Sequence, residues 1–287
     1  MLPVYKKEMR TYFTQMPGYI FLAFFLLLIG IFFTLVNVRG ADGNFQHVLS
    51  NVIIFFFILM PVLTMRIFSE EARQKTDQLL FTSPLSITGI VLGKFFAALT
   101  LFLIGVAVTA VMPFLLRNYG ELPVNQIVGT YIGFCLFGMA CIAIGVFISV
   151  LTENQIIAAV GTMAAIFIMF LIDAIAASMP TTTIASFVFV IFVIFAVTSV
   201  FYNSTRKISA AVIVGVIAVV IAGGLYFFNN LIFDGIIVRT LLWFSIYSRF
   251  SSFTRGILRV SDIAYYISFA ALFIYFTVNV IEKRRWR

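Results

Sequence analysis

Side chains that commonly carry out chemistry are scarce in this sequence and lie far apart. His47 is the only histidine, and Cys135 and Cys141 are the only cysteines. The two cysteines fall on different faces of one apolar helical segment, so we expect them to be small packing residues. Zinc sites need three or four closely spaced His, Cys or acidic ligands, and we therefore predict no metal site.

Asp173 is the acidic residue that stands out, because it lies inside a long apolar run. An ionisable side chain within a membrane segment is by default a functional candidate, and a transport role is one interpretation. The alternative is structural, since Asp173 lies within about two helical turns of the polar loop 179–183 and can reach the membrane surface. A membrane enzyme would need paired acids, a nucleophile with a base, or metal ligands. The apolar segments offer little besides Asp173, so the sequence disfavours an enzyme.

The longest polar interruption in the first half of the chain covers residues 66–94. Glu71 with Lys75, and Arg73 with Asp77, are pairs of opposite charge spaced four residues apart, as on one helix face. The spacing predicts a short helix within this stretch. Apolar sequence flanks the stretch on both sides, so it lies at a membrane surface.

We place this polar helix at 69–81. Leu79 and Leu80 give it an apolar end, and Ser83, which precedes Pro84, is biased away from helical geometry and closes it. Such a helix is suited to dock into a soluble partner. A solvated loop with incidental charges is the alternative, and the sequence pattern alone does not separate the two.

The composition is that of a membrane protein. Hydrophobic residues make up 62% of the 287 residues, charged residues 10%, and the mean hydropathy is +1.12. Soluble domains carry about a quarter charged residues. The apolar runs lack the two-residue period of a barrel, so the predicted fold class is an all-α integral membrane protein. The net charge of +8 suits membrane orientation and anionic lipid rather than nucleic acid.

Residues 2–16 predict a helix that lies in the membrane interface. Tyr5, Met9 and Tyr12 recur at helical spacing, with Lys6 and Lys7 off that face. A cleaved signal peptide is the competing interpretation, but no small-residue cleavage site follows the apolar run. We expect an uncleaved interfacial helix.

We predict a single transmembrane domain over 1–287 with eight spans and an external segment, 229–261, of short interfacial or re-entrant helices rich in aromatic residues and arginine. Gly129 and Gly133 stand at GxxxG spacing, for which ordinary intramolecular packing is the expected use. The predicted spans are 19–38, 48–67, 90–116, 125–150, 156–177, 184–202, 208–228 and 263–281.

The basic residues predict the orientation. With the N-terminus inside, eight spans place all six lysines and 13 of the 19 basic residues on the inside. Because basic residues concentrate in cytoplasmic segments, both termini and the 66–94 stretch are predicted to be cytoplasmic.

With this topology, two runs resemble the cytoplasmic loop of ABC-2 type transporter permeases: Arg66-Ile-Phe-Ser-Glu-Glu-Ala-Arg73 and Thr76-Asp-Gln-Leu-Leu-Phe-Thr-Ser-Pro-Leu-Ser86. Within the family they look most like the gliding-motility-type branch, which is related to the copper-processing permeases of nitrous oxide reductase clusters. The likeness covers residues 1–177 and 240–287. Three further runs agree with it: Leu151-Thr-Glu-Asn-Gln155, Arg255-Gly-Ile-Leu-Arg-Val-Ser-Asp-Ile-Ala-Tyr-Tyr266 and Glu282-Lys-Arg-Arg-Trp286.

The resemblance implies that helix 69–81 is a coupling helix seated in a cleft of a separate ABC ATPase subunit. It also implies two permease subunits, the same or homologous, with two ATPase subunits in a bacterial plasma membrane. ATP would be bound by the partner, and this chain would carry no cofactor. The residues assigned to coupling are Glu70, Glu71, Arg73, Thr76, Asp77, Gln78, Leu79 and Leu80.

Two features depart from the family pattern. Lys75 and Gln78 stand where the family usually has glycine and glutamate, and the spans in 184–228 are a hairpin added to the common six.

The chain has no phosphate loop of its own, because Gly93-Lys94 lacks the upstream glycine and the following Ser or Thr. The predicted function is therefore a permease subunit, expected to export. The alternatives are a passive channel, a membrane scaffold and a lipid-modifying enzyme.

Overall fold

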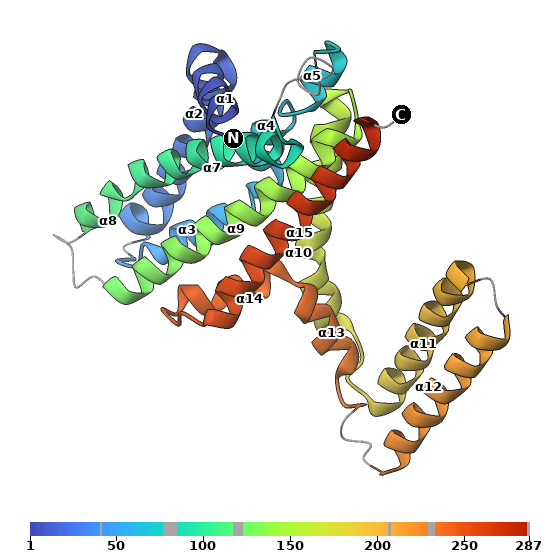
Figure 1. Cartoon of the computed structure of the whole chain (residues 1–287). Helices are drawn as coiled ribbons and strands as arrows, with labels where there is room; N and C mark the ends of the chain where they lie inside the picture. Colours follow the sequence, from blue (N-terminus) through green and yellow to red (C-terminus); the bar gives the residue numbers. More distant parts are fainter. Residues whose placement is uncertain (41, 77–84, 117–122, 206–207, 229–232, 286–287) are drawn as a thin grey trace. The chain divides into compact units, whose positions relative to one another are not determined.

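The computed structural model describes residues 1–40, 42–76, 85–116, 123–205, 208–228 and 233–285. Helices are the regular elements throughout these residues (Figure 1), and the all-α prediction is confirmed. The chain divides into two compact units. Unit 1 comprises Met1–Phe170 and Ile246–Arg287, and unit 2 comprises Leu171–Ser245.

Unit 1 begins with two helices that are separated by a single extended residue. Helix α1 covers Leu2–Thr14, and α2 covers Met16–Phe33 and continues into the π-helical turn η1, Thr34–Arg39. The predicted N-terminal helix is thus confirmed, although it ends at Thr14 because Gln15 is extended before Met16 and Pro17. Its position at a membrane interface stays a prediction.

The predicted second span is broken. Helix α3, Gln46–Ile53, and α4, Phe56–Thr64, are bent by 68° at a short turn. The turn brings the ring of Phe56 against those of Phe102, Phe134 and Phe137, so burial of this ring accompanies the break.

After α4 come the short helix α5, Ser69–Arg73, and α7, Ile87–Thr109, which is capped by the Ser86 hydroxyl. The remaining helices are α8, Val111–Leu116; α9, Val124–Leu151; α10, Gln155–Ser178; α14, Ile246–Thr254; and α15, Val260–Arg285. Helices α9, α10 and α15 match the predicted spans 125–150, 156–177 and 263–281 within four residues, and α7 with α8 covers the predicted span 90–116. Helix α10 passes from unit 1 into unit 2.

Helix α9 is the centre of unit 1 and packs against α3, α4, α7, α14 and α15 (Figure 1). Its glycines make this contact possible. A Cβ at Gly133 would overlap the Phe253 side chain, one at Gly138 the Phe102 ring, and one at Gly145 the Thr64 side chain. A Cβ at Gly129 would likewise meet the Phe253 carbonyl oxygen, so the predicted role of the GxxxG glycines, Gly129 and Gly133, in intramolecular packing is confirmed.

Unit 2 contains the hairpin that was predicted over 184–228. Helices α11, Thr183–Thr205, and α12, Ile208–Phe228, pack against each other, and the short helix α13 covers Ile236–Phe244. The rings of Phe187, Tyr226 and Phe233 meet at one end of the hairpin. The short helices predicted in 229–261 correspond to α13 in unit 2 and α14 in unit 1.

Five described helices are long and apolar enough to cross a membrane, and the count is six if the bent pair α3–α4 is one span. In the hairpin, the described apolar parts are shorter, Thr183–Ser199 and Val212–Phe227. The chain is a multi-pass membrane protein, and the count of eight spans stays a prediction.

Candidate functional site

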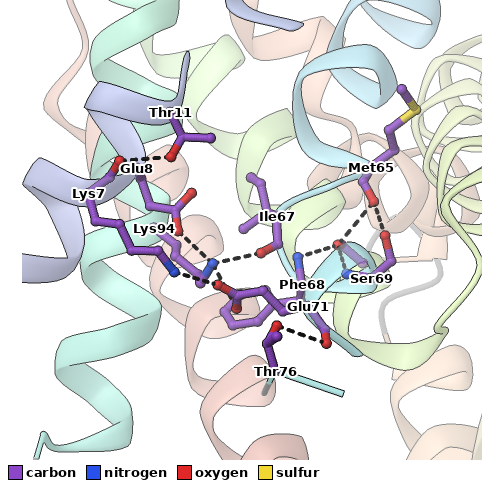
Figure 2. A network of polar contacts seen from close by, with 11 residues as sticks. Lys7, Glu8, Thr11, Met65, Ile67, Phe68, Ser69, Glu71, Thr76 and Lys94 are labelled. Carbon is purple, nitrogen blue, oxygen red and sulfur yellow. Dashed lines mark hydrogen bonds and ion pairs between the residues drawn. The ribbon is translucent and has the colours of Figure 1, made fainter. Parts of the chain in front are cut away.

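Three parts of unit 1 meet around the side chain of Lys94, near the start of α7: helix α1, the segment that follows α4, and α7 itself (Figure 2). Helix α1 lies close to α7 because Gly89 and Gly93 present no side chain there, and a Cβ at Gly93 would touch Met1 and Val4. The Lys94 side chain is only 1% exposed. A buried ammonium group requires charged or polar partners, so its surroundings must supply them.

Three oxygen atoms surround the Lys94 ammonium group. It donates hydrogen bonds to Glu8 Oε1 at 2.8 Å and to the Ile67 carbonyl at 2.9 Å. It also forms an ion pair with Glu71 Oε2 at 3.0 Å. The Phe68 ring lies below it, 5.1 Å from Nζ to the ring centre. The ammonium group of Lys94, a residue of α7, therefore has partners on α1, on α5 and on the segment that leads into α5.

The charges alternate along this cluster. The second oxygen of Glu71, Oε1, binds Lys7 Nζ at 3.2 Å, so the order is Glu8, Lys94, Glu71, Lys7. Glu8 and Glu71 are 14% and 16% exposed, whereas Lys7 is 60% exposed. We call these four residues the Lys94 network. It is electrically neutral, and it runs from the interior to the surface.

Ser149 fixes the start of α5 from another direction. Its hydroxyl oxygen accepts hydrogen bonds from the backbone N–H groups of Phe68 at 3.0 Å and Ser69 at 3.2 Å. Ser149 belongs to α9, the central helix of the unit. Helix N-termini leave their first N–H groups without intrahelical partners, and Ser149 supplies that acceptor. Helix α5 is thereby attached to α9 as well as to α1 and α7.

The prediction of one continuous helix over 69–81 is wrong in its first half. Helix α5 ends at Arg73, and Lys75 has a left-handed backbone with φ +57°. The N–H of Thr76 bonds the Glu71 carbonyl and that of Lys75 bonds the Ala72 carbonyl, which is the Schellman arrangement that ends a helix. The predicted Glu71–Lys75 pair is replaced by the ion pairs of Glu71 with Lys94 and Lys7.

The predicted coupling residues thus fall into three groups. Glu71 points into the protein, which contradicts the expectation that it faces a partner. Glu70 is half-buried and accepts from Gln74 at 3.4 Å, while Arg73 and Thr76 are exposed. Asp77, Gln78, Leu79 and Leu80 lie outside the described residues.

Asp173 does not belong to this cluster. It lies in the part of α10 that is in unit 2, where it accepts a hydrogen bond from the Ser245 hydroxyl at 2.6 Å. Thr183 and Asp234 form a second hydrogen-bonded pair in the same unit. The proposed intramembrane polar site therefore rests on a carboxylate that already has a hydroxyl partner.

Sequence reasoning missed Lys94, Glu8 and Ser149. A signal for Lys94 existed, because it is a lone lysine within the predicted span 90–116, and the rule applied to Asp173 applies equally to it. Glu8 and Ser149 carried no such signal, since acids and serines are ordinary at their positions. Their roles depend on three-dimensional proximity.

A second ion pair lies between α14 and α15. Arg249 Nη1 binds Asp262 Oδ1 at 3.1 Å, and the guanidinium group lies 4.0 Å from the centre of the Tyr265 ring. Asp262 is buried in the first turn of α15. This pair attaches the short helix α14 to the last long helix. Within the described parts of the chain, no three His, Cys, Asp or Glu side chains converge as a metal site would require.

These features define a helical, multi-pass membrane protein with a short helix, α5, that is attached to the central helix α9 and to α1 and α7. The family profile of the ABC-2 family transporter proteins matches residues 35–203, more than half of the chain. The chain therefore belongs to the ABC-2 family of transporter membrane proteins. Neither the curated proteins nor the solved structures gave a match.

Proposed function

We propose that this chain is the permease subunit of an ABC-2 exporter of the gliding-motility-type branch, driven by a separate ATPase subunit. The proposed assembly contains two permease and two ATPase subunits in a bacterial plasma membrane, with both permease termini in the cytoplasm. Family membership supports the permease role, because ABC-2 proteins are the membrane components of transporters. Asp173 stays a proposed polar site within the spans.

One observation carries the proposal: helix α5 is held firmly on its inner side and open on its outer side. Ser149 and Lys94 attach it to α9 and α7, whereas Arg73, its last residue, and Gln74 and Lys75, which follow it, are exposed. An element that receives force from a partner needs both properties. A solvated loop with incidental charges would not require a buried ionic anchor.

The charges exposed on α5 and on the residues beside it indicate what kind of surface the partner presents. Arg66, Arg73 and Lys75 are exposed, and Glu70 is the half-buried acid among them. Charge complementarity at an interface steers association and suppresses wrong partners. We therefore propose that the ATPase presents carboxylate groups to this surface, in place of the basic groups that an outward-facing Glu71 would have required.

The test is purification of the tagged chain from its native membrane, followed by measurement of ATP hydrolysis and identification of the associated proteins. An ATPase should be recovered with the wild-type chain. The variant Arg66→Glu/Arg73→Glu should recover at least about tenfold less, as expected for reversed interface charges. The matched control is Arg255→Glu, on the predicted external side, which should recover the wild-type amount. Equal recovery by both variants, or no ATPase with the wild type, would refute the proposal.

A further inference from the structure

We propose that Lys94 is the positioning residue through which a movement of α5 reaches α1 and α7. The inference rests on the proposed function, since it concerns how a partner's movement enters the membrane helices. Lys94 contacts Glu8 of α1, Glu71 of α5 and the Ile67 carbonyl before α5 (Figure 2). It is the member of the network on which the other contacts converge.

Lys94 is the residue that connects α7 to both acids of the network. Removing Glu8 leaves the Lys94–Glu71 pair, and removing Lys7 leaves both pairs of Lys94. Removing Lys94 separates α7 from both acids at once. Glu71 would then keep Lys7 alone, and Glu8 would lose its ion pair. The Lys94 network is therefore organised around α7, the long helix that follows the α5 segment in the chain.

A buried ionic contact is stiff. Separating buried charges without water to replace the partner is costly, so elements joined by such a contact move together. Lys94 is almost fully buried, and its two acids are mostly buried. A displacement of α5 that carries Glu71 will therefore pull on the Lys94 ammonium group, and through it on α7 and Glu8.

The charges of the Lys94 network serve the direction of the contacts between the helices rather than the stability of the fold. Buried ion pairs are often replaceable by neutral groups of similar size with little or no loss of stability. A neutral set at these positions should accordingly fold, while it would lack the directional contacts. This property separates a positioning role from a structural one, because a structural role is fulfilled once stability is restored.

Helix α5 has a second attachment. The N–H groups at its start donate to Ser149 of α9. Two residues further along the helix, Glu71 forms ion pairs with Lys94 and Lys7. Helix α5 therefore has one end attached to the central helix and its side attached to α7 and α1. A rotation of α5 about its hydrogen bonds to Ser149 would displace Glu71 and so act first on the Lys94 ammonium group.

The experiment uses the full chain in complex with its co-purifying ATPase. Cys135 and Cys141 are replaced by alanine, and a reporter Gly43→Cys is introduced on the predicted external side, where Gly43 is exposed and a Cβ meets no atom within 4 Å. The rate of labelling by an impermeant thiol reagent is compared without nucleotide and after trapping with ATP and vanadate. In the otherwise unaltered complex the two rates should differ by about tenfold, as when a minor conformation becomes the major one.

The decisive variant is Glu8→Gln/Glu71→Gln/Lys94→Met. It should keep the unfolding midpoint and the bound amount of ATPase, because the exposed side of α5 is unchanged, and it should lose the nucleotide-dependent difference in labelling. A second variant, Glu8→Gln alone, keeps the Lys94–Glu71 pair and should fold with a reduced difference. The control Lys6→Met removes an exposed lysine of α1 and should behave as the reporter background does.

Three results would overturn the inference. A full nucleotide response in both network variants would mean that the network is structural only. A response lost equally in Lys6→Met would mean that the effect is not specific to Lys94. No response in the reporter background, despite bound ATPase, would remove the movement that Lys94 is proposed to pass on. Absence of any ATPase would instead refute the proposed function itself.

Discussion

At the scale of single residues, the orientation of Glu71 changes what a mutation there is expected to do. Glu71→Lys would place a second ammonium group beside Lys94, which is 1% exposed, and would break two ion pairs. Loss of a buried charge partner costs about 3–5 kcal/mol. We expect the free energy of unfolding in detergent to fall by about that amount, and membrane levels to fall with it.

The matched control is Glu70→Lys. Glu70 is half-buried and its one described side-chain contact is with Gln74 in the same short stretch. Its reversal should change the free energy of unfolding by no more than about 0.5 kcal/mol, as at ordinary surface sites. Equal stabilities of the two variants would contradict the inward placement of Glu71.

Lys75 occupies a backbone conformation that favours glycine. Its φ of +57° ends α5, and non-glycine residues pay about 1–2 kcal/mol in this region. We therefore expect Lys75→Gly to stabilise the segment by about 1 kcal/mol, measured as slower amide hydrogen exchange over 69–76. The control Gln74→Gly, at a right-handed position, should speed exchange. Faster exchange in Lys75→Gly would contradict the left-handed turn.

Asp42 gives the loop between η1 and α3 a dependence on pH. The hydrogen bond from His47 Nδ1, 2.5 Å from Asp42 Oδ2, and the N–H of Asn44 lower the Asp42 pKa below its usual range. Because the folded pKa is the lower one, the stabilisation is present above the unfolded value of about 3.9 and is lost as pH falls through the folded value.

Amide exchange over 42–50 should therefore accelerate as the pH falls below about 4, after correction for the intrinsic rate. In Asp42→Asn that additional acceleration should be absent, because no carboxylate titrates there. An acid response of the same size in both proteins would show that another group controls this loop.

At the scale of elements, the crossing of α4 and α9 depends on a single missing side chain. A Cβ at Gly145 would overlap the Thr64 side chain, whose hydroxyl donates to the Met60 carbonyl at 2.9 Å. We expect Gly145→Ala to lower the free energy of unfolding by about 1–3 kcal/mol, as overpacking does. Gly30→Ala is the control, because a Cβ there meets nothing within 4 Å. It should be neutral or stabilising by up to about 1 kcal/mol; a loss like that of Gly145→Ala would contradict this account.

The helices themselves were largely predictable from the sequence. Long apolar runs can satisfy their backbone groups in a membrane only as helices, so α2, α7, α9, α10 and α15 follow the runs closely. The break between α3 and α4 was not predictable, because no proline or glycine stands at it. It accompanies the burial of the Phe56 ring, which is a tertiary effect.

The candidate site was predictable in location but not in arrangement. The polar stretch 66–94 marked the correct segment, whereas spacing rules paired Glu71 with Lys75 four residues away. Local pairs contribute only about 0.2–0.5 kcal/mol, so a buried ammonium group nearby competes successfully for the same carboxylate. Glu8 lies 86 residues from Lys94 in the sequence, and no local pattern reports such a contact.

At the scale of the whole molecule, the chain divides into a helical bundle, unit 1, and a unit that carries the hairpin α11–α12, unit 2. Unit 1 holds the Lys94 network, the central helix α9 and both ends of the chain. Unit 2 holds α11 and α12, and more than half of the side chains described in these two helices are exposed. Helices α11 and α12 are apolar on all sides, which suits a lipid environment.

The central claim is that an ATPase docks on the exposed side of α5. The most direct measurement is site-specific photo-crosslinking in the native membrane, with a photoreactive amino acid at Arg73 and, in a separate protein, at the exposed Ser251 of α14. The account predicts an ATPase crosslinked at position 73, and none at position 251 on the predicted external side. An ATPase captured equally from both positions, or from neither, would contradict it.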